Sequence, residues 1–169
     1  MTRHRATTAL LTLAQAGQAH VFFGLLYESV VRIPDRLSTD RVLAAGADEP
    51  GGAPPLLRPG NPALYFLPSA PLTLAASLGA LVAGRRAPAG RRWSATSAAA
   101  TLAFVVETAT VLHPVNERLF HAAEPPTDDE RAELLRRWYR LNAIRLVFVG
   151  IAWASSQRAK SRLRGTSPA

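Results

Sequence analysis

The stretch WSATSAAATLAFVVETATVLHPVNERL, Trp93–Leu119, decides the fold. Its first 14 residues, up to Val106, carry no charge, and a glutamate, a His-Pro pair and Asn-Glu-Arg then follow in quick succession. At a rise of about 1.5 Å per residue, an uncharged helix of this kind crosses much of a hydrocarbon core of about 30 Å. We interpret residues 94–113 as a membrane helix whose polar groups collect near its outer end.

Three further stretches are predominantly apolar and are predicted to span the membrane at about residues 7–31, 67–84 and 138–156. The chain has 169 residues, which is enough for one domain. We therefore expect a single all-α domain over 1–169, folded as a four-helix transmembrane bundle.

The distribution of charge predicts the orientation. Half of the 20 Lys and Arg residues lie in the short segments 1–6, 84–93 and 157–169, which contain none of the 12 acidic residues. Because short cytoplasmic loops collect Lys and Arg, we place both termini in the cytoplasm and segments 32–66 and 114–137 in outer loops. This alternation is not expected of a nucleic-acid-binding face, so we predict the lipid bilayer as partner and a bacterial cytoplasmic membrane as location.

Two other interpretations of the apolar stretches remain open at this point. A soluble helical protein would also contain long Ala-rich segments. The first stretch also resembles a signal peptide, with Ala14-Gln15-Ala16 as its cleavage site. The apolar run Val21–Val31 continues beyond that point, which favours an uncleaved span.

Residues 34–62, rich in proline and glycine, are predicted to be a loop without a core of its own.

Several polar residues within the spans share one depth. With the N-terminus inside, Glu28, Glu107, His113, Asn142 and Arg145 all lie toward the outer ends of their spans. A charged group costs about 2.5–3.5 kcal/mol to insert and usually faces the bundle interior. We predict a polar pocket that opens outward, with a Glu107–Arg145 pair at its centre because each charge would otherwise remain unpaired.

Each of these residues also has a purely structural interpretation. A Glu–Arg pair with an asparagine can fix helix register, Glu28 can reach interfacial water, and His113 can cap a helix end. His20 shares a helical face with Glu28 and can simply pack against its neighbours.

No metal or nucleotide site is predicted. His20, Glu28, Glu107 and His113 offer imidazole and carboxylate groups, but none of them has the spacing of a metal-binding motif. The chain has no cysteine and no glycine-rich phosphate loop or dinucleotide fingerprint.

Two motifs carry a resemblance. HPVNERL follows the third apolar stretch, and RWYRLNAIRLVFVGIA opens the fourth. Their pattern, Pro-Val-Asn-x-x-Leu at Pro114–Leu119 and then Trp-x-x-x-Asn-x-x-Arg from Trp138 to Arg145, resembles the anthrone oxygenase-like four-span membrane proteins, the family of domain of unknown function 1772. The resemblance adds Asn116 and Trp138 to the candidate residues.

This resemblance implies a membrane oxygenase-like enzyme acting on an apolar aromatic, anthrone-like substrate, because some fungal members oxidise anthrones to anthraquinones with dioxygen. Dioxygen would be the co-substrate, and any further cofactor is unknown. Glu107, Glu28 or His113 would be the catalytic base, and Arg145 would stabilise the oxyanion. The expected substrate-binding or motif residues are Asn116, Asn142, Trp138 and His20. The alternative is a non-catalytic small membrane transporter or helper subunit, and the chain would in either case suit a homo-oligomer.

Overall fold

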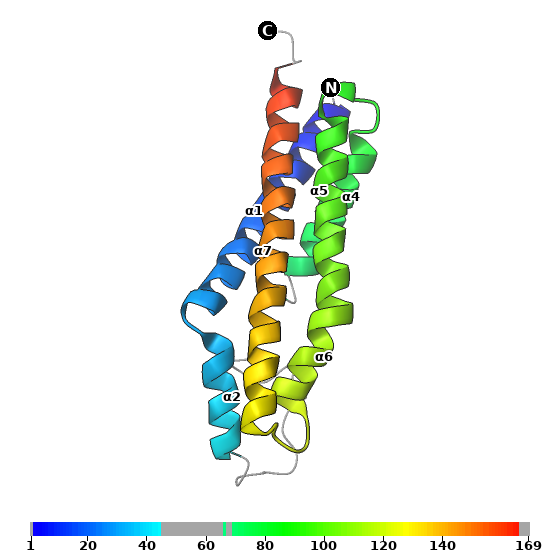
Figure 1. Ribbon diagram of the computed structural model, residues 1–169. Coiled ribbons are helices and arrows are strands. Elements are labelled where there is room, and N and C mark those ends of the chain that lie inside the picture. Colours follow the sequence, from blue (N-terminus) through cyan, green and yellow to red (C-terminus); the bar gives the residue numbers. More distant parts are fainter. Residues whose placement is uncertain (1, 45–65, 67–68, 166–169) are drawn as a thin grey trace.

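A computed structural model describes residues 2–44, 66 and 69–165 of the chain. Every regular element in these residues is helical, which confirms the all-α prediction (Figure 1). The main helices are α1 (Thr2–Val30), α2 (Ile33–Ala44), α4 (Ser69–Ala83), α5 (Pro88–Glu107) and α7 (Asp128–Arg164).

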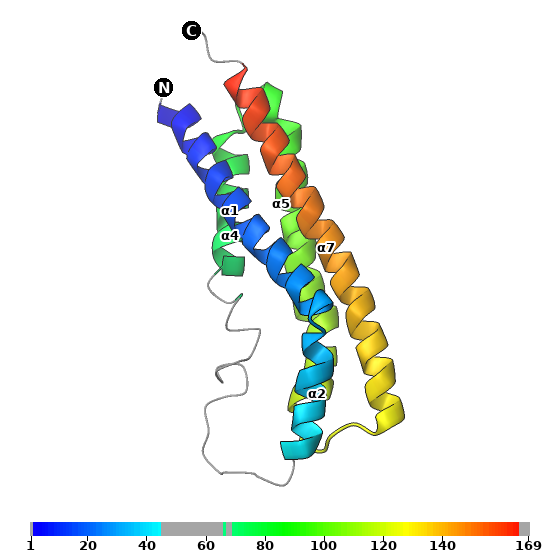
Figure 2. The same cartoon turned by 90° about the vertical axis from the view of Figure 1, so that its left-hand side faces the viewer.

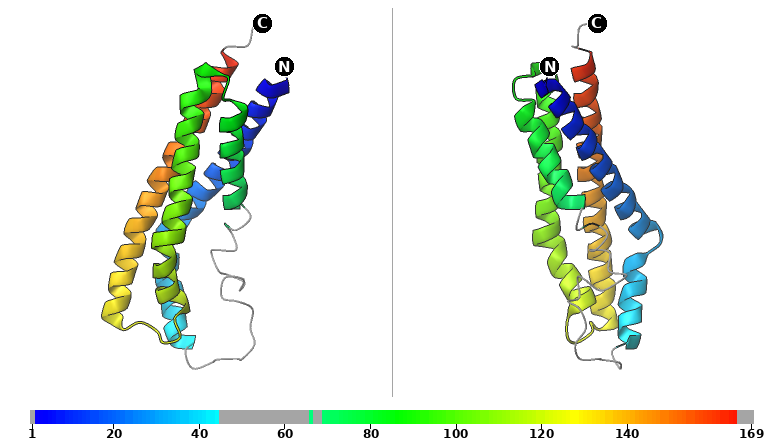
Figure 3. Two further views of the ribbon diagram at one scale, coloured as in Figure 1. Left: turned by 90° about the vertical axis from the view of Figure 1, so that its right-hand side faces the viewer. Right: turned by 180° about the vertical axis from the view of Figure 1, so that it is seen from behind.

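Four of these helices enclose a common interior. Helix α1 packs against α4 and α7, and α5 packs against the same two helices from the other side. The start of α1, the end of α7 and the α4–α5 turn lie together at one end of the molecule, which we call the basic end, and α2 lies at the opposite end (Figure 1). Helix α4 is short and borders only the half of the interior nearer the basic end (Figure 3).

The interior contains three apolar layers. The layer at the basic end consists of Leu11, Ala80, Ala159 and Leu163. The middle layer consists of Val21, Leu25, Phe104 and Val149. The layer at the α2 end consists of Leu112, Val115, Trp138 and Leu141. All four stretches that were predicted as spans contribute to these layers.

The chain breaks between α1 and α2 at Arg32, whose φ of 55° is rare for a non-glycine residue. Pro34 then sits in the first turn of α2, where proline lacks only an amide that would have no helical partner, and Asp35 suits the positive helix N-terminus. We had expected a loop over 34–62, so α2 corrects its first part, and the remainder lies outside the described residues. Figure 2 shows α2 extending beyond the end of α1.

Helix α5 ends at Glu107, but the helical path continues beyond residue 113, the expected end of the third stretch. A π-helical segment, Thr108–Leu112, leads into α6 (His113–Asn116) and a second π-helical segment, Glu117–His121. The His113 amide donates to the Thr108 carbonyl five residues earlier. Pro114 falls in the first turn of α6, where its missing amide is tolerated. The first residues of the expected outer loop 114–137 are therefore helical.

Helix α7 begins at Asp128 and runs unbroken to Arg164. The sequence predicts this start, because Thr127 and Glu130 have the spacing of a capping box and acidic residues suit a helix N-terminus. The Thr127 hydroxyl accepts a hydrogen bond of 3.3 Å from the Glu130 amide. The Glu130 carboxylate does not return to the cap. It accepts two hydrogen bonds from Arg118, at 2.5 and 2.6 Å, which tie the start of α7 to the segment after α6.

Within the described residues, two helical segments are long and apolar enough to cross a membrane, His4–Val30 with 27 residues and Pro88–His121 with 34 residues. Helix α4 is apolar but has only 15 residues. Many large apolar side chains of α1, α4, α5 and α7 point away from the interior and are exposed, among them Phe23 (57%), Val82 (62%), Val106 (50%) and Val147 (59%).

Candidate functional site

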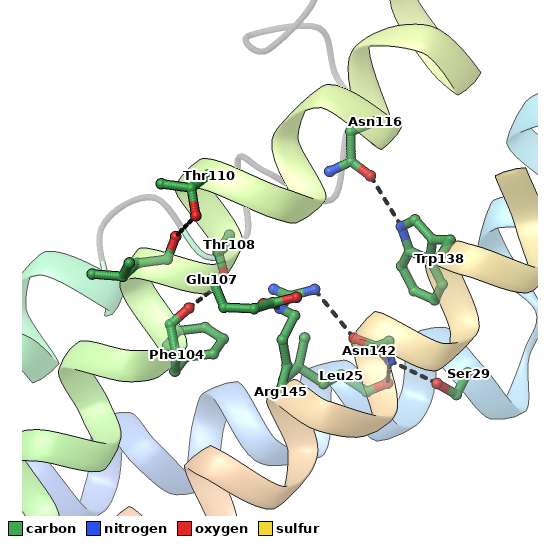
Figure 4. Close-up of polar contacts among 11 residues, drawn as sticks. Leu25, Ser29, Phe104, Glu107, Thr108, Thr110, Asn116, Trp138, Asn142 and Arg145 are labelled. Atoms are coloured by element: carbon green, nitrogen blue, oxygen red, sulfur yellow. Dashed lines mark hydrogen bonds and ion pairs between the residues drawn. The ribbon is translucent and has the colours of Figure 1, made fainter.

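Arg145 lies at the centre of a buried polar cluster between α1, α5 and α7 (Figure 4). Its Nε atom is 3.9 Å from Oε2 of Glu107, and the two side chains are only 6% and 11% exposed. The predicted Glu107–Arg145 pair is therefore present. The guanidinium carbon also lies 5.2 Å from the centre of the Phe104 ring, so the cation is held between a carboxylate and an aromatic face.

Asn142 connects this cluster to α1. Its amide nitrogen donates to the Leu25 carbonyl at 3.0 Å and to the Ser29 hydroxyl at 2.7 Å. Its amide oxygen accepts a hydrogen bond of 3.1 Å from Nη1 of Arg145. Because an asparagine amide offers two donors and one acceptor oxygen, these contacts fix both its position and the direction of the arginine.

A second carboxyl group belongs to the cluster. Glu28, one turn beyond Gly24 on α1, is 7% exposed and interacts electrostatically with Arg145. Glu28, Glu107 and Arg145 would together carry one net negative charge if all three were ionised. In a low dielectric this imbalance favours the uptake of one proton or of a further positive charge.

Glu107 and Arg145 retain unused hydrogen-bonding capacity. Both carboxylate oxygens of Glu107 and Nε of Arg145 are buried and form no hydrogen bond within the part of the chain that the structure describes. The 3.9 Å between them is too long for a hydrogen bond. Buried acceptor and donor atoms without partners are unusual in proteins, and they could form hydrogen bonds with a water molecule or a polar ligand group placed beside the pair.

The backbone is irregular at this position. Glu107 is the last residue of α5 before the π-helical turn Thr108–Leu112. The Thr108 and Thr110 hydroxyls donate to the carbonyls four residues earlier, at 2.8 and 2.7 Å (Figure 4). Single π-helical turns inside α-helices often occur at functional sites, because the extra residue changes the direction of the adjacent side chains.

The two family motifs meet next to the cluster. Trp138 is 4% exposed, and its indole nitrogen donates to the Asn116 side-chain oxygen at 3.0 Å (Figure 4). This bond joins the start of the fourth apolar stretch to the end of the third. Trp138, Asn142 and Arg145 lie on one face of α7, as their spacing predicted.

The two candidate histidines, His113 and His20, lie apart from the Arg145 cluster and from the Trp138–Asn116 bond. His113 is half exposed, and its Nδ1 atom is 3.8 Å from Glu117 on the next turn. The His20 ring packs edge-on against Phe66, with 6.1 Å between the ring centres. Among the described residues no group of three His, Asp or Glu side chains has the arrangement of a metal site.

A layer of uncharged polar side chains lies closer to the basic end, and the sequence analysis missed it. The Gln18 amide nitrogen lies 3.0–3.3 Å from the hydroxyls of Ser77, Ser97 and Thr101, and Ser97 and Ser156 are 2.7 Å apart. Gln18 is an uncharged polar residue in the middle of an apolar stretch, and this was the only available signal. Small hydroxyl residues in Ala-rich helices give no signal of their own.

A cavity of about 10 Å³ separates Gln18 from Phe104, and Val149 and Thr101 also line it. This volume is about that needed for one water molecule.

Comparisons with known proteins identify the family of the chain. A model of the anthrone oxygenase family matches residues 62–155, which include Glu107, Asn116, Trp138, Asn142 and Arg145. No curated protein and no solved structure matches the chain. The family match covers more than half of the chain and agrees with the resemblance carried by the two motifs. The chain belongs to the anthrone oxygenase family.

Proposed function

We propose that this protein is a four-span membrane oxygenase-like enzyme that oxidises an apolar aromatic, anthrone-like substrate with dioxygen at the Glu107–Arg145 cluster. The observation that carries this proposal is the buried, incompletely hydrogen-bonded pair of Glu107 and Arg145 within the segment matched by the family. Both termini would lie in the cytoplasm, and α2 with the α6 segment would lie outside.

The proposed membrane location is supported by the low buried fraction of the apolar helices. Only 39% of the most apolar window of His4–Val30 and 33% of that of Pro88–His121 are buried inside the molecule. The core helix of a soluble protein would bury most of such a window. Exposed apolar side chains on α1, α4, α5 and α7 suit contact with lipid.

The chemistry would begin with a proton transfer. Glu107 has two carboxylate oxygens without a hydrogen bond, so it is the better placed of the candidate bases, and Glu28 is the second. Removal of a proton from the activated methylene carbon of an anthrone leaves an electron-rich anion. This anion reduces dioxygen with formation of a carbon–oxygen bond, and loss of water from the resulting hydroperoxide leaves the quinone carbonyl. One dioxygen is consumed and one water is released per substrate.

Arg145 would stabilise the negative charge that develops on oxygen. Its position over Phe104 and its bond to Asn142 keep the guanidinium in one orientation, so little reorganisation is needed during the reaction. His113, which we had also considered as a base, is half exposed and paired with Glu117, and we assign it no part in this proton transfer.

The test uses membranes that contain the protein and follows oxygen-dependent conversion of a polyketide anthrone to its quinone. Empty-vector membranes provide the rate of autoxidation. Glu107→Gln is expected to lower the enzymatic rate by about 10²–10⁴-fold, the usual contribution of a general base. Arg145→Lys keeps the buried charge but loses the planar fork, and we expect a decrease of about 10²-fold or more.

The matched control is Arg136→Gln, which removes an arginine from the same helix at an exposed pair with Glu133. It should retain full activity. Full activity in both Glu107→Gln and Arg145→Lys would disprove the site assignment. Conversion by the folded wild type no faster than by empty membranes would remove anthrones as substrates and favour the non-catalytic transporter or helper subunit.

A further inference from the structure

A groove of about 450 Å³ lies at the basic end, where the first turns of α1 pass the last turn of α7. We call it the basic groove. It is lined by His4, Arg5, Thr8, Ala9, Thr12 and Arg164. Figure 1 shows the two helix ends that form it, and the right-hand view of Figure 3 shows them from behind. Its volume lies within the range of small-ligand sites, about 300–1,000 Å³.

Two arginines from opposite ends of the chain meet in this groove without a counter-charge. Arg5 and Arg164 are exposed, and neither forms an ion pair or a hydrogen bond with a side chain of the described residues. Some other cations of the basic end do have partners. Lys160 donates to Gln15 at 3.4 Å, and Arg158 lies over the Trp93 ring at 5.9 Å.

The surroundings do not neutralise this charge. Segments 1–6, 84–93 and 157–169 contain no acidic residue, and their described residues lie at the basic end. Two guanidinium groups that line one groove, with no Asp or Glu among the described residues that line it, form a site for an anion. Guanidinium groups match the geometry of phosphate oxygens especially well.

The shape of the groove indicates that this anion is attached to an apolar chain. Residues 5, 8, 9 and 12 lie along one side of α1, so the groove runs about 10 Å from the arginines toward the middle of the helix. Thr12 donates its hydroxyl to the Thr8 carbonyl at 2.9 Å, so it needs no further partner. Beyond it, Leu13 is 42% exposed. The groove is therefore charged at its end, and its wall farther along α1 carries only small uncharged side chains.

We propose that the basic groove binds the phosphate headgroup of an anionic phospholipid between Arg5 and Arg164, with an acyl chain lying along Thr8, Ala9 and Thr12. The proposal rests on the membrane location proposed above, and the predicted orientation places the lipid in the cytoplasmic leaflet, which is rich in such lipids. A bound lipid would hold the two ends of the chain together, because Arg5 lies on the first helix and Arg164 on the last.

The experiment uses the full chain in a zwitterionic detergent. Native mass spectrometry counts the lipids that remain bound after addition of phosphatidylglycerol or phosphatidylcholine at equal concentrations. We expect the wild type to bind phosphatidylglycerol at least about tenfold more tightly. Arg5→Gln/Arg164→Gln should lose this preference. Arg85→Gln/Arg86→Gln removes the same charge from the exposed α4–α5 turn at the same end and should keep it.

Glycerol phosphate provides the soluble headgroup without acyl chains. We expect it to compete weakly, whereas competition as strong as that of the lipid would show that the groove takes a free phosphate compound and would overturn the lipid assignment. Equal loss of binding in both double variants, or no preference of the wild type, would also overturn it. If Arg5→Gln/Arg164→Gln does not fold, the wild-type titrations still decide. None of these measurements depends on an anthrone, so they are independent of the enzyme assay.

Discussion

Arg145 shows how a single buried cation can organise its surroundings. It interacts with carboxyl groups from two different helices, Glu107 and Glu28, and with Asn142 on its own helix. Asn142 in turn is bonded to α1 through Leu25 and Ser29. A purely structural ion pair would be expected to close with direct hydrogen bonds. The open Glu107–Arg145 contact is more typical of a site that accommodates another group.

Gly17 determines how closely α1 and α4 approach each other. A Cβ atom at this position would lie 1.9 Å from the Thr73 hydroxyl oxygen and 3.0 Å from the Thr73 Cβ. Thr73 is 4% exposed, and its hydroxyl donates to the Ser69 carbonyl at 2.6 Å, so the side chain has little freedom to move away. Gly17 therefore lies on the face of α1 that packs against α4.

We therefore predict that Gly17→Ala lowers the free energy of unfolding by about 1–3 kcal/mol, the usual effect of overpacking. Thermal unfolding of the purified protein in detergent would measure it. Gly17→Ala/Thr73→Ala should recover part of the loss, because the nearest clashing atom is removed.

Gly150 is the matched control for this prediction. A Cβ atom there would lie 3.6 Å from Phe22, an ordinary contact, so Gly150→Ala should be neutral or stabilise α7 by up to about 1 kcal/mol. If the free energy of unfolding of Gly17→Ala equalled that of Gly150→Ala, the result would contradict the close approach of α1 and α4.

At the scale of the helices, polar contacts attach α2 to the rest of the molecule. The Asp35 carboxylate accepts hydrogen bonds from the Tyr139 hydroxyl and, at 2.6 Å, from Arg32. Arg131 donates to the Thr39 hydroxyl at 3.1 Å. Pro34 and Ser38 on α2 are also buried, so one face of α2 packs against its neighbours in addition to these polar contacts.

The attachment of α2 should depend on pH. Partial burial raises the pKa of Asp35, but hydrogen bonds from Tyr139 and Arg32 outweigh this and leave its pKa below the ordinary value of 3.8. A carboxyl group whose pKa is lowered by folding contributes its full stabilisation above its unfolded pKa. That contribution is lost as the pH falls through the lower folded value.

We predict that α2 becomes more mobile as the pH is lowered from about 5 to below the ordinary Asp pKa. The chain has no cysteine, so one spin label at Arg36→Cys on α2 would report the motion without interference. Asp35→Asn should remove the pH dependence, and a label at Ser161→Cys on the end of α7 should not respond. Equal responses at both positions would indicate general unfolding instead.

Some helix boundaries could not be predicted from the sequence. Apolar stretches predicted the middle parts of α1, α4, α5 and α7, and the Thr127 cap predicted the start of α7. The sequence analysis interpreted Pro34 and Pro114 as the start of loops, yet both prolines occupy first turns of helices. Proline is compatible with both situations, and only the packing of neighbouring helices decides between them.

For the molecule as a whole, the charged residues of the candidate site could be predicted from the sequence. Glu107, Arg145 and Glu28 were identified because an ionisable group in an apolar helix needs a partner, and their common depth followed from the order of the spans. Phe104, Ser29 and the Leu25 carbonyl were missed, because an aromatic ring, a serine and a backbone oxygen are ordinary features of any helix. Their part in the cluster depends on the rotation of each helix, which the tertiary packing sets.

The last prediction concerns the orientation of the whole molecule. The start of α1 and the end of α7 lie at the same end, as an even number of crossings requires (Figure 1). The predicted orientation places this basic end in the cytoplasm and the loop after His121 outside. Ala123 in that loop and Ser161 at the basic end are both exposed, so single cysteines at these positions can react with a maleimide that does not cross membranes.

We expect Ala123→Cys to be labelled in intact bacterial cells and Ser161→Cys only after the cells are permeabilised. Labelling after permeabilisation is the control that both cysteines are accessible. The reverse pattern would keep the spans but invert the molecule, and the lipid proposed for the basic groove would then lie in the outer leaflet. Labelling of both in intact cells would mean that α7 does not cross the membrane and lies outside, whereas protection of both would place α7 and its two ends on the cytoplasmic side. In the last case the exposed apolar side chains of α1 and α5 would have to be covered by another protein.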